Sequence, residues 1–402
     1  MAERRARLGR RHHLAAGARA GDPLEVARGL VALHATDPTS VYLGAWARMT
    51  GGDVAGVERA LYDQRVLIRL LGMRRTVFVT PVETAPVILA ACSRAVAARE
   101  RRKLISWLAE SGVAADPEPW LKDVEETALR ALTARGEATA AELAADDPRL
   151  RAQIVLARGK AYEGRAGVAS RVLFLLAADG RVVRGRPAGS WASSQYRWAP
   201  LESWCPDGLA DWDTDAAGVE LARRWLAAFG PATAEDLRWW TGWSAGQVKR
   251  VLARLRPAEV DLDGTAGLVL PGDLDPVPAP EPWAALLPPL DSTPMGWSQR
   301  DWFLGPHGPR LFDRTGNVGP TVWWDGRVIG GWAQRAAKGK GAGGTGRRVA
   351  AGEIAVAFLE DAGADAVAAV EAAAEQLAGR LGPVRVTARG RGPSPVEQEL
   401  TR

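Results

Sequence analysis

The sequence predicts an α+β fold assembled from tandem copies of one supersecondary unit. The pattern G-x-A-T-x-x-[ED]-L occurs twice, in segments that begin at Gly136 and Gly230. A helix-like stretch precedes each copy, and a second helix-like stretch and a short β-hairpin pattern follow it. This order is typical of a winged helix, and a repeat of whole units indicates tandem modules. Tandem winged helices usually bind nucleic acid.

The threonine in each copy of the pattern predicts where a short helix begins. The hydroxyl groups of Thr139 and Thr233 can accept hydrogen bonds from the free N–H groups of the first helical turn. The acid three residues later, Glu142 or Asp236, can bond back to the N–H of the threonine. We therefore expect a capping box at both sites.

Helix caps and turn signals divide the chain into three modules. The dipeptides Asp179-Gly180 and Asp263-Gly264 each stand near an apolar run, which is a strong hairpin signal. The first predicted module is 1–115, with helices at 22–33, 53–65 and 83–111 and strands within 66–80. The second is 116–210, with a wing formed by strands at 171–177 and 181–186. The third is 211–275, with a recognition-type helix at 244–255 and a wing formed by strands at 259–262 and 268–270.

The remainder of the chain is predicted to be rich in strands. The Pro- and Gly-rich segment 271–296 is expected to be ordered, because Trp283, Leu286 and Leu290 are too apolar for a free linker. We expect strands at 321–324, 328–332, 353–359 and 384–388, a helix at 364–380, a β-rich part that spans 276–390, and a disordered tail at 391–402. The basic N-terminal segment is interpreted either as a solvated tail or as an arm that contacts DNA.

Composition excludes several classes of protein. The 402 residues include only two cysteines and four histidines, which argues against a disulfide scaffold, a Cys-ligated zinc site and a His-rich metal centre. No apolar run reaches the ~18 residues that span a membrane. The formal charge of +5 is compatible with nucleic acid. We expect a monomer without metal or cofactor, with nucleic acid as its partner and no membrane.

His34 and Thr36 are the candidate catalytic residues. They are two positions apart, so in an extended segment both side chains point the same way, with Ala35 turned to the core. Two polar side chains on one side can hold a water molecule between them. The alternative interpretation is a helix end and a turn, with Asp37-Pro38 starting the next element.

Three other segments are candidates for DNA contact. Arg74 and Arg75 lie in a strand-like setting, where they either contact phosphates or form salt bridges with Asp37, Glu58 or Asp63. The segment 185–198 combines aromatic, hydroxyl and cationic side chains, which suit stacking on bases or contact with the DNA backbone. The alternative is a folded loop whose tryptophans fill gaps between modules. Its candidate residues are Arg186, Trp191, Gln195 and Arg197.

A glycine-rich basic segment lies between two predicted strands near the C-terminus. It contains no acid, and its cations suit a hairpin tip that binds a DNA groove or phosphates. The alternative is a solvated loop without a binding role. Its cations are Arg335, Lys338, Lys340, Arg347 and Arg348.

Five segments together resemble the bacterial winged-helix DNA-binding protein family that includes the AlkZ- and YcaQ-type DNA glycosylases. They are LVALHATDPTSVYLGAWAR, LGMRRTVFV, GRPAGSWASSQYRWAP, FGPATAEDLRWWTG and LLPPLDSTPMGWSQRDWFLGPH with the LFDRTGNVGPTVWWDGRVIGGW that follows, in this order over about residues 20–390.

The resemblance implies three tandem winged helices in a C-shaped body, a β-rich part and duplex DNA in the concave face. It implies a monofunctional glycosylase that excises bulky N7-alkylated purines, unhooks interstrand crosslinks and acts in DNA repair and self-resistance, in the cytoplasm at the nucleoid. The family's catalytic motif is Gln, an apolar residue, then Gln or Asp. These polar positions correspond to His34 and Thr36, neither of which is a carboxamide.

Two alternatives remain open from the sequence. A non-catalytic winged-helix protein, such as a regulator or a damage binder, would share the same modules, and so would a structural interaction protein. Exposure of His34 and Thr36 in a basic cleft would favour the enzyme, whereas their burial in a core would favour a binding protein.

Overall fold

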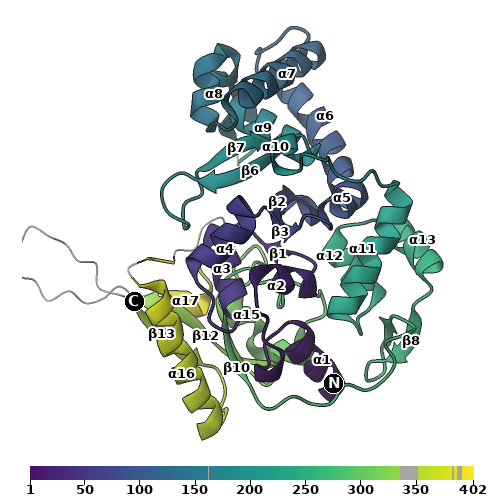
Figure 1. The fold of residues 1–402 in the computed structure, drawn as a ribbon, viewed down its shortest axis with the longest axis vertical. Coiled ribbons are helices and arrows are strands. Elements are labelled where there is room, and N and C mark those ends of the chain that lie inside the picture. Colours follow the sequence, from purple (N-terminus) through teal and green to yellow (C-terminus); the bar gives the residue numbers. More distant parts are fainter. Residues whose placement is uncertain (162, 336–351, 383, 387–391) are drawn as a thin grey trace, which may run out of the picture. The chain divides into compact units, whose positions relative to one another are not determined.

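The structure is a computed structural model that describes residues 1–161, 163–335, 352–382, 384–386 and 392–402. Helices and strands are both abundant, as the α+β prediction requires. The chain forms two compact units (Figure 1). Unit 1 comprises Met1–Ala60 and Ala222–Arg402, and unit 2 comprises Leu61–Leu221. Unit 1 therefore contains both ends of the chain.

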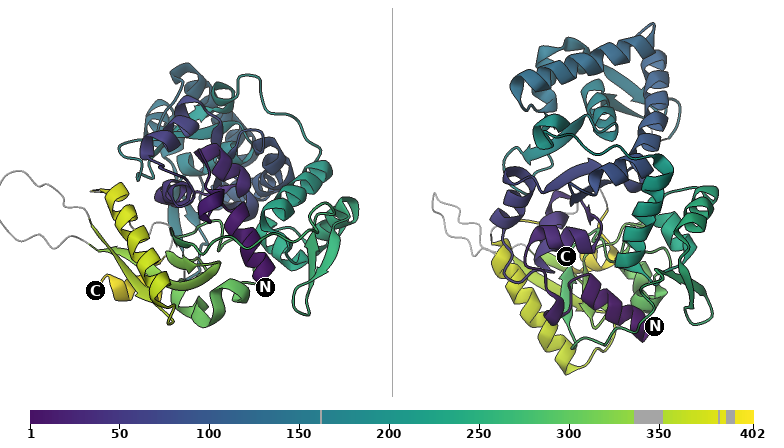
Figure 2. Two further views of the ribbon diagram at one scale, coloured as in Figure 1. Left: turned by 60° about the horizontal axis from the view of Figure 1, so that its bottom comes forward. Right: turned by 45° about the vertical axis from the view of Figure 1, so that its right-hand side comes forward.

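A four-stranded antiparallel sheet, in the order β10-β11-β12-β13, forms the centre of unit 1. Helix α16 packs along this sheet (Figure 2), and the buried indole of Trp332 donates to the Leu287 carbonyl at 2.9 Å. The helices of unit 1 are α1 (Ala2–Arg11), α2 (Pro23–Gly29), α3 (Pro38–Trp46), α4 (Val54–Glu58), α12 (Ala234–Thr241), α13 (Ala245–Leu255), α14 (Asp301–Leu304), α15 (Gly308–Leu311), α16 (Ala364–Leu381) and α17 (Pro395–Leu400). The strands are β1 (Leu33–His34), β8 (Ala258–Asp261), β9 (Ala266–Val269), β10 (Ala284–Leu287), β11 (Thr321–Trp324), β12 (Arg327–Arg335) and β13 (Glu353–Phe358).

Unit 2 is built from helices that surround short antiparallel strand pairs. Its largest apolar core lies between α6, α7, α8 and α9. The helices are α5 (Ala85–Ile88), α6 (Arg94–Glu110), α7 (Pro117–Arg135), α8 (Ala140–Asp146), α9 (Val168–Ala178) and α10 (Leu201–Trp204), and α11 (Thr214–Phe229) crosses the boundary into unit 1. The strands are β2 (Leu67–Leu71), β3 (Val77–Pro81), β4 (Gln153–Leu156), β5 (Gly164–Gly167), β6 (Val182–Pro187) and β7 (Tyr196–Pro200).

Both copies of the repeated pattern start a short helix in the same way. Thr139 and Thr233 form the predicted capping boxes at the starts of α8 and α12. In each copy the alanine before the threonine is fully buried and exchanges two backbone hydrogen bonds with a hairpin strand. Ala138 pairs with Trp198 of β7, and Ala232 pairs with Leu268 of β9. The repeat in sequence is therefore a repeat in structure.

The prediction of a strand at 171–177 is wrong. These residues belong to α9, which buries Val172, Leu173 and Leu176 in the core of unit 2. A short apolar run fits a buried helix as well as a strand, so periodicity could not decide between them. Asp179-Gly180 ends this helix, with Gly180 at φ +73°, and the hairpin is instead β6–β7.

Both chain ends are more ordered than predicted. The basic N-terminal segment is helix α1, in which Arg4 and Arg7 are buried, and it is not a solvated tail. The C-terminal tail forms α17, capped by Ser394 and packed on β12 through its buried apolar residues. Residues 384–386 are not a strand, and 387–388 lie outside the described residues. No helix that the structure describes has both the length and the apolar character to cross a membrane.

Candidate functional site

The segment with His34 and Thr36 connects α2 to α3 within unit 1. The chain leaves α2 through Val31 at φ +62°, a left-handed conformation that is unfavourable for a β-branched residue. Buried Asp37 then caps α3, accepting from the N–H of Thr39 at 3.0 Å and from its hydroxyl at 2.7 Å. Every residue of α3 is buried, so this helix is a fixed support for the segment before it.

Ser292, in the loop that follows β10, fixes the backbone on the N-terminal side of the candidate pair. Its hydroxyl donates to the Ala32 carbonyl at 2.9 Å and accepts from the His34 N–H at 3.0 Å. Ser40 of α3 donates to the Pro289 carbonyl at 2.6 Å, so the same loop is also bonded to the helix after the pair. The backbone around His34 is thus held by hydrogen bonds to residues far away in sequence.

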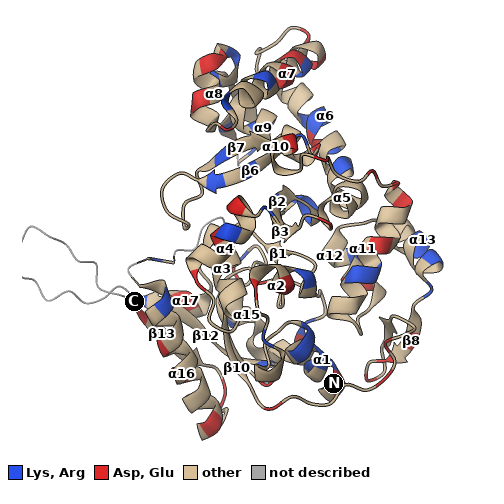
Figure 3. Cartoon of the chain, in the orientation of Figure 1, with Lys and Arg blue, Asp and Glu red and all other residues tan. Residues whose placement is uncertain are grey.

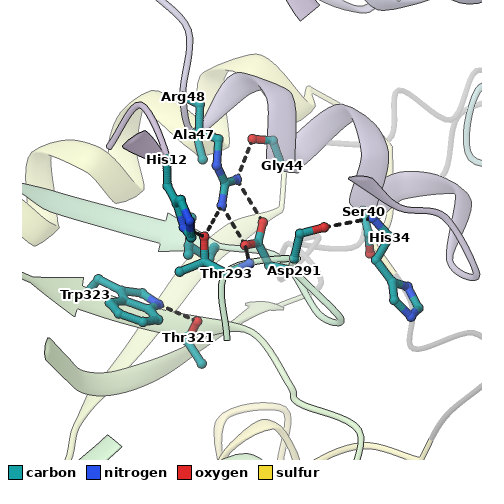
Figure 4. Close-up of polar contacts among 12 residues, drawn as sticks. His12, His34, Ser40, Gly44, Ala47, Arg48, Asp291, Thr293, Thr321 and Trp323 are labelled. Atoms are coloured by element: carbon teal, nitrogen blue, oxygen red, sulfur yellow. Dashed lines mark hydrogen bonds and ion pairs between the residues drawn. The ribbon is translucent and has the colours of Figure 1, made fainter. Parts of the chain in front are cut away.

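A buried ion pair fixes this loop to α3 (Figure 4). The Arg48 guanidinium donates to both Asp291 carboxylate oxygens, at 2.9 and 2.6 Å, and to Thr293 Oγ1 at 2.7 Å. It also donates to the Gly44 carbonyl at 2.7 Å. Both charged side chains are essentially inaccessible, at 0% and 1% exposed. A Cβ at Gly44 would lie only 3.3 Å from Asp291 Oδ2, so glycine allows the loop its close approach.

His12 completes this buried network. Its Nε2 lies 3.2 Å from the Ala228 carbonyl, which can only accept, so Nε2 carries the proton. Its Nδ1, 2.8 Å from Thr293 Oγ1, then accepts from that hydroxyl. Burial, together with the nearby Arg48 charge, holds the pKa of His12 well below its ordinary value. His12 is therefore neutral and structural at physiological pH.

His34 and Thr36 differ in their exposure. Thr36 is exposed, whereas His34 is buried, with 7% of its surface accessible. In Figure 4 the imidazole ring of His34 points away from the cluster of Arg48 and Asp291. The pair therefore does not share the open setting that their spacing predicts. A histidine with little access to solvent can bind or deprotonate one water molecule, and an exposed threonine hydroxyl can orient it.

Arg74 and Arg75 form the tip of the β2–β3 hairpin in unit 2, both with positive φ, at +52° and +64°. Burial lowers the pKa of Arg74 to about 10. Arg75 Nε lies 2.9 Å from Glu100 Oε2, and its guanidinium covers the Phe174 ring at 4.8 Å. Arg75 is thus paired with an acid other than the three that the salt-bridge interpretation named.

Arg186 and Trp191 belong to the β6–β7 hairpin and its connecting loop. Arg186 lies 3.0 Å from Asp63 Oδ1 and covers the Tyr62 ring at 4.7 Å, while its side chain stays 43% exposed. Trp191 is buried, so it offers little ring surface for stacking on a base. Arg186 is therefore the more accessible of these two candidates.

Gln195 and Arg197 come next in the same hairpin. Gln195 is exposed. Arg197 Nε lies 2.6 Å from Glu137 Oε1, and its Nη2 lies 3.4 Å from Glu142 Oε2, so it pairs with the capping-box acid of α8. The structure thus gives Arg197 a role in joining the hairpin to α8.

The basic segment near the C-terminus is described only at its start. Arg335 ends β12, and its Nε donates to the Leu400 carbonyl at 2.6 Å. Its other candidates, Lys338, Lys340, Arg347 and Arg348, lie outside the described residues. In the part of the chain that the structure describes, no group of three or more His, Cys, Asp or Glu side chains is placed to hold a metal ion.

The residues that hold the candidate site were not predicted from the sequence. Arg48 and Asp291 are separated by 243 positions, and nothing local pairs them. The only sequence signal is the run Asp291-Ser292-Thr293, three polar residues inside the apolar segment that was expected to be ordered.

We expect Ser292→Ala to slow catalysis beyond its effect on folding, because it releases both the Ala32 carbonyl and the His34 N–H. The loss of two buried hydrogen bonds costs about 1–3 kcal/mol of the free energy of unfolding. For the glycosylase activity that the sequence resemblance implies, we expect a several-fold lower rate at saturating DNA. Ser40→Ala is the matched control, since it removes a buried hydroxyl from the same interface but no bond to His34. Equal rates in the two variants would contradict a positioning role for Ser292.

The chain is similar to known DNA glycosylases in sequence and in fold. The family model for DNA glycosylase AlkZ-like proteins matches residues 27–380. The solved structure of the Streptomyces sahachiroi DNA glycosylase AlkZ superimposes with a TM-score of 0.71 at 22% sequence identity, covering 96% of this chain and 98% of that chain. At that identity the match shows a shared fold. No curated protein matches the sequence significantly.

Proposed function

This chain belongs to the AlkZ-like DNA glycosylase family, and we propose that its substrates are bulky N7-alkylated purines in duplex DNA. Membership makes it a hydrolase that acts on N-glycosyl bonds in DNA. The further proposal is that it also unhooks interstrand crosslinks attached at N7.

The observation that supports this proposal most is the position and support of His34 and Thr36. The sequence resemblance implies that they correspond to the two polar positions of the family's catalytic motif. The Ser292 bridge and the Asp37 cap hold the backbone on either side of the pair. A site that must place one water molecule needs such rigid support.

The proposed reaction is direct hydrolysis. An N7-alkylated purine is cationic, so it leaves as a neutral base when the bond between its ring nitrogen and C1′ breaks, and no strong acid is needed. Water supplies the oxygen to C1′ and releases a proton. The imidazole of His34 takes that proton or orients the water, and Thr36 provides the second anchor. The products are the free alkylpurine and an abasic site. A bulky adduct also need not be flipped out of the helix, which would cost a few kcal/mol.

We propose that the repeated units are winged helices. In each one the capped short helix is followed by a second helix and a hairpin whose last strand bonds to the alanine of the pattern. We also propose that these modules form the duplex-binding part of a C-shaped body, with boundaries near residues 115, 210 and 275.

We propose water, and not an amine, as the nucleophile. A lyase-type glycosylase needs an amine whose pKa burial lowers toward neutrality. Lys103 is half exposed and bonded to Glu100 at 2.8 Å, and Lys122, Lys160 and Lys249 are exposed. None of these is a buried amine.

The test of this proposal is incubation of the protein with duplex oligonucleotides that carry N7-methylguanine, a bulkier N7 adduct or an N7-linked crosslink. We expect strand breaks only after alkaline treatment, which cleaves abasic sites, and no enzyme–DNA adduct after borohydride reduction. A trapped adduct would show that an amine attacks C1′. Intact duplex with all three substrates would contradict the proposed substrate class.

One observation favours the alternative of a DNA-binding protein without catalysis. His34 is only 7% exposed, and low accessibility is what a structural histidine would show. A protein of this kind would bind the three oligonucleotides with salt-dependent affinity and release no base from any of them.

A further inference from the structure

Helix α13 presents a row of cations to solvent. Its apolar residues face inward, whereas Lys249 and Arg250 lie on its exposed face and Arg256 follows directly after it. The stretch Ser244–Pro257 contains no acid. Figure 3 shows this concentration of positive charge on α13. We refer to Lys249, Arg250 and Arg256 as the α13 cations.

Many arginines that the structure describes have a counter-ion within the chain, and the α13 cations do not. Arg75, Arg149 and Arg197, for example, all pair with acids of their own unit. In the described part of the chain, Lys249, Arg250 and Arg256 form no salt bridge. Three like charges within eight residues repel one another, and an external anion would relieve this repulsion.

The backbone of Arg256 supports a role outside the fold. It ends α13 at φ +52° and ψ +55°, the left-handed position that glycine fills at least cost. A glycine there would still donate the backbone N–H bond to the Leu252 carbonyl, at 2.9 Å. A strained cationic residue where glycine would suffice points to a use for its side chain.

The hairpin after α13 carries the opposite charge. Glu259, Asp261 and Asp263 are all exposed on β8 and its turn, and this hairpin has no lysine or arginine. Asp263 Oδ2 lies 3.5 Å from the N-terminal amine of the chain. Phosphates would repel this hairpin, so it is unsuited to lie against a DNA backbone.

We propose that the α13 cations bind the backbone phosphates of duplex DNA, while the β8–β9 hairpin stays off the DNA. This rests on the proposed function, since it takes duplex DNA as the partner. The surface adds affinity without reading sequence, because phosphate contacts position a protein on any duplex. It lies outside the His34 segment and takes no part in bond cleavage.

The test is a salt titration of binding to undamaged duplex by fluorescence anisotropy. The variant combines Lys249→Gln, Arg250→Gln and Arg256→Gly, and the glycine keeps the helix end unstrained. Each lost phosphate contact lowers the slope of log affinity against log salt by about 0.9, so we expect a slope smaller by about 2 to 3.

The control variant removes three exposed cations of unit 1 that already have partners inside the chain. It combines Arg10→Gln, Arg310→Gln and Arg327→Gln. An equal fall in slope for the control would show an effect of net charge alone and would overturn the proposal, as would an unchanged slope for the α13 variant. Glu259→Gln is expected to leave affinity unchanged, and tighter binding would show that the hairpin does approach DNA.

This experiment separates the inference from the proposed function. If the wild-type protein binds duplex DNA and excises the adduct but the α13 variant keeps the full slope, only the inference fails. If the wild-type protein does not bind duplex DNA, the proposed function fails together with it.

Discussion

Replacing His34 with alanine is expected to abolish excision of N7-alkylated purines while duplex binding persists. The substitution removes the imidazole that we propose holds or deprotonates the attacking water, and a positioned base contributes about 10²–10⁴-fold to a rate. The Ser292 bridge uses the backbone N–H of residue 34, which alanine retains, so the fold around the site is preserved. Single-turnover excision and anisotropy measurements together test this expectation.

His34→Gln is the informative partner of that variant. It introduces the carboxamide that the sequence resemblance implies at this position, so we expect it to keep substantial activity. Wild-type excision by His34→Ala would show that the side chain has no chemical role. Loss of excision together with loss of binding would instead indicate a structural role.

Breaking the ion pair between Arg48 and Asp291 is expected to give the largest loss of stability. Arg48→Met leaves a carboxylate buried without its counter-charge, and removing one partner of such a pair costs about 3–5 kcal/mol. The double variant Arg48→Met with Asp291→Leu is expected to recover much of this loss, because an apolar pair of similar volume needs no counter-charge. Urea unfolding followed by tryptophan fluorescence measures both.

An exposed pair in the same unit provides the comparison. Arg310 and Glu399 are 47% and 61% exposed, so Arg310→Met is expected to cost less than about 1 kcal/mol. If Arg48→Met is no more costly than Arg310→Met, the buried pair does not stabilise the loop next to His34.

Features that depend on neighbouring residues were predictable from the sequence. The capping boxes at Thr139 and Thr233 need only an acid three positions later, and both form. The strands predicted at 321–324 and 328–332 likewise form β11 and part of β12, and Asp325-Gly326 makes the turn between them with positive φ at both residues. These signals are local, so no knowledge of the tertiary structure is needed to interpret them.

Features that depend on distant contacts were not predictable. The apolar run in α9 is a helix because it completes the core of unit 2, and α17 is ordered because β12 offers it a surface. The Arg48–Asp291 pair and the Ser292 bridge join positions more than 240 residues apart. The spacing of His34 and Thr36 predicts that both side chains point the same way. It does not predict that they differ in exposure, because the surrounding elements determine how accessible each side chain is.

Hydrolysis with His34 as the group that activates water is tested most directly by detection of the released base. Wild-type protein and His34→Ala are incubated with duplex DNA that carries one N7-alkylguanine, and the soluble fraction is analysed by mass spectrometry. We predict that the wild-type protein releases the intact alkylguanine in equal amount to the abasic sites formed, and that His34→Ala releases it only at the uncatalysed rate. Binding of this duplex by the wild-type protein without release of the base above that background would contradict the account.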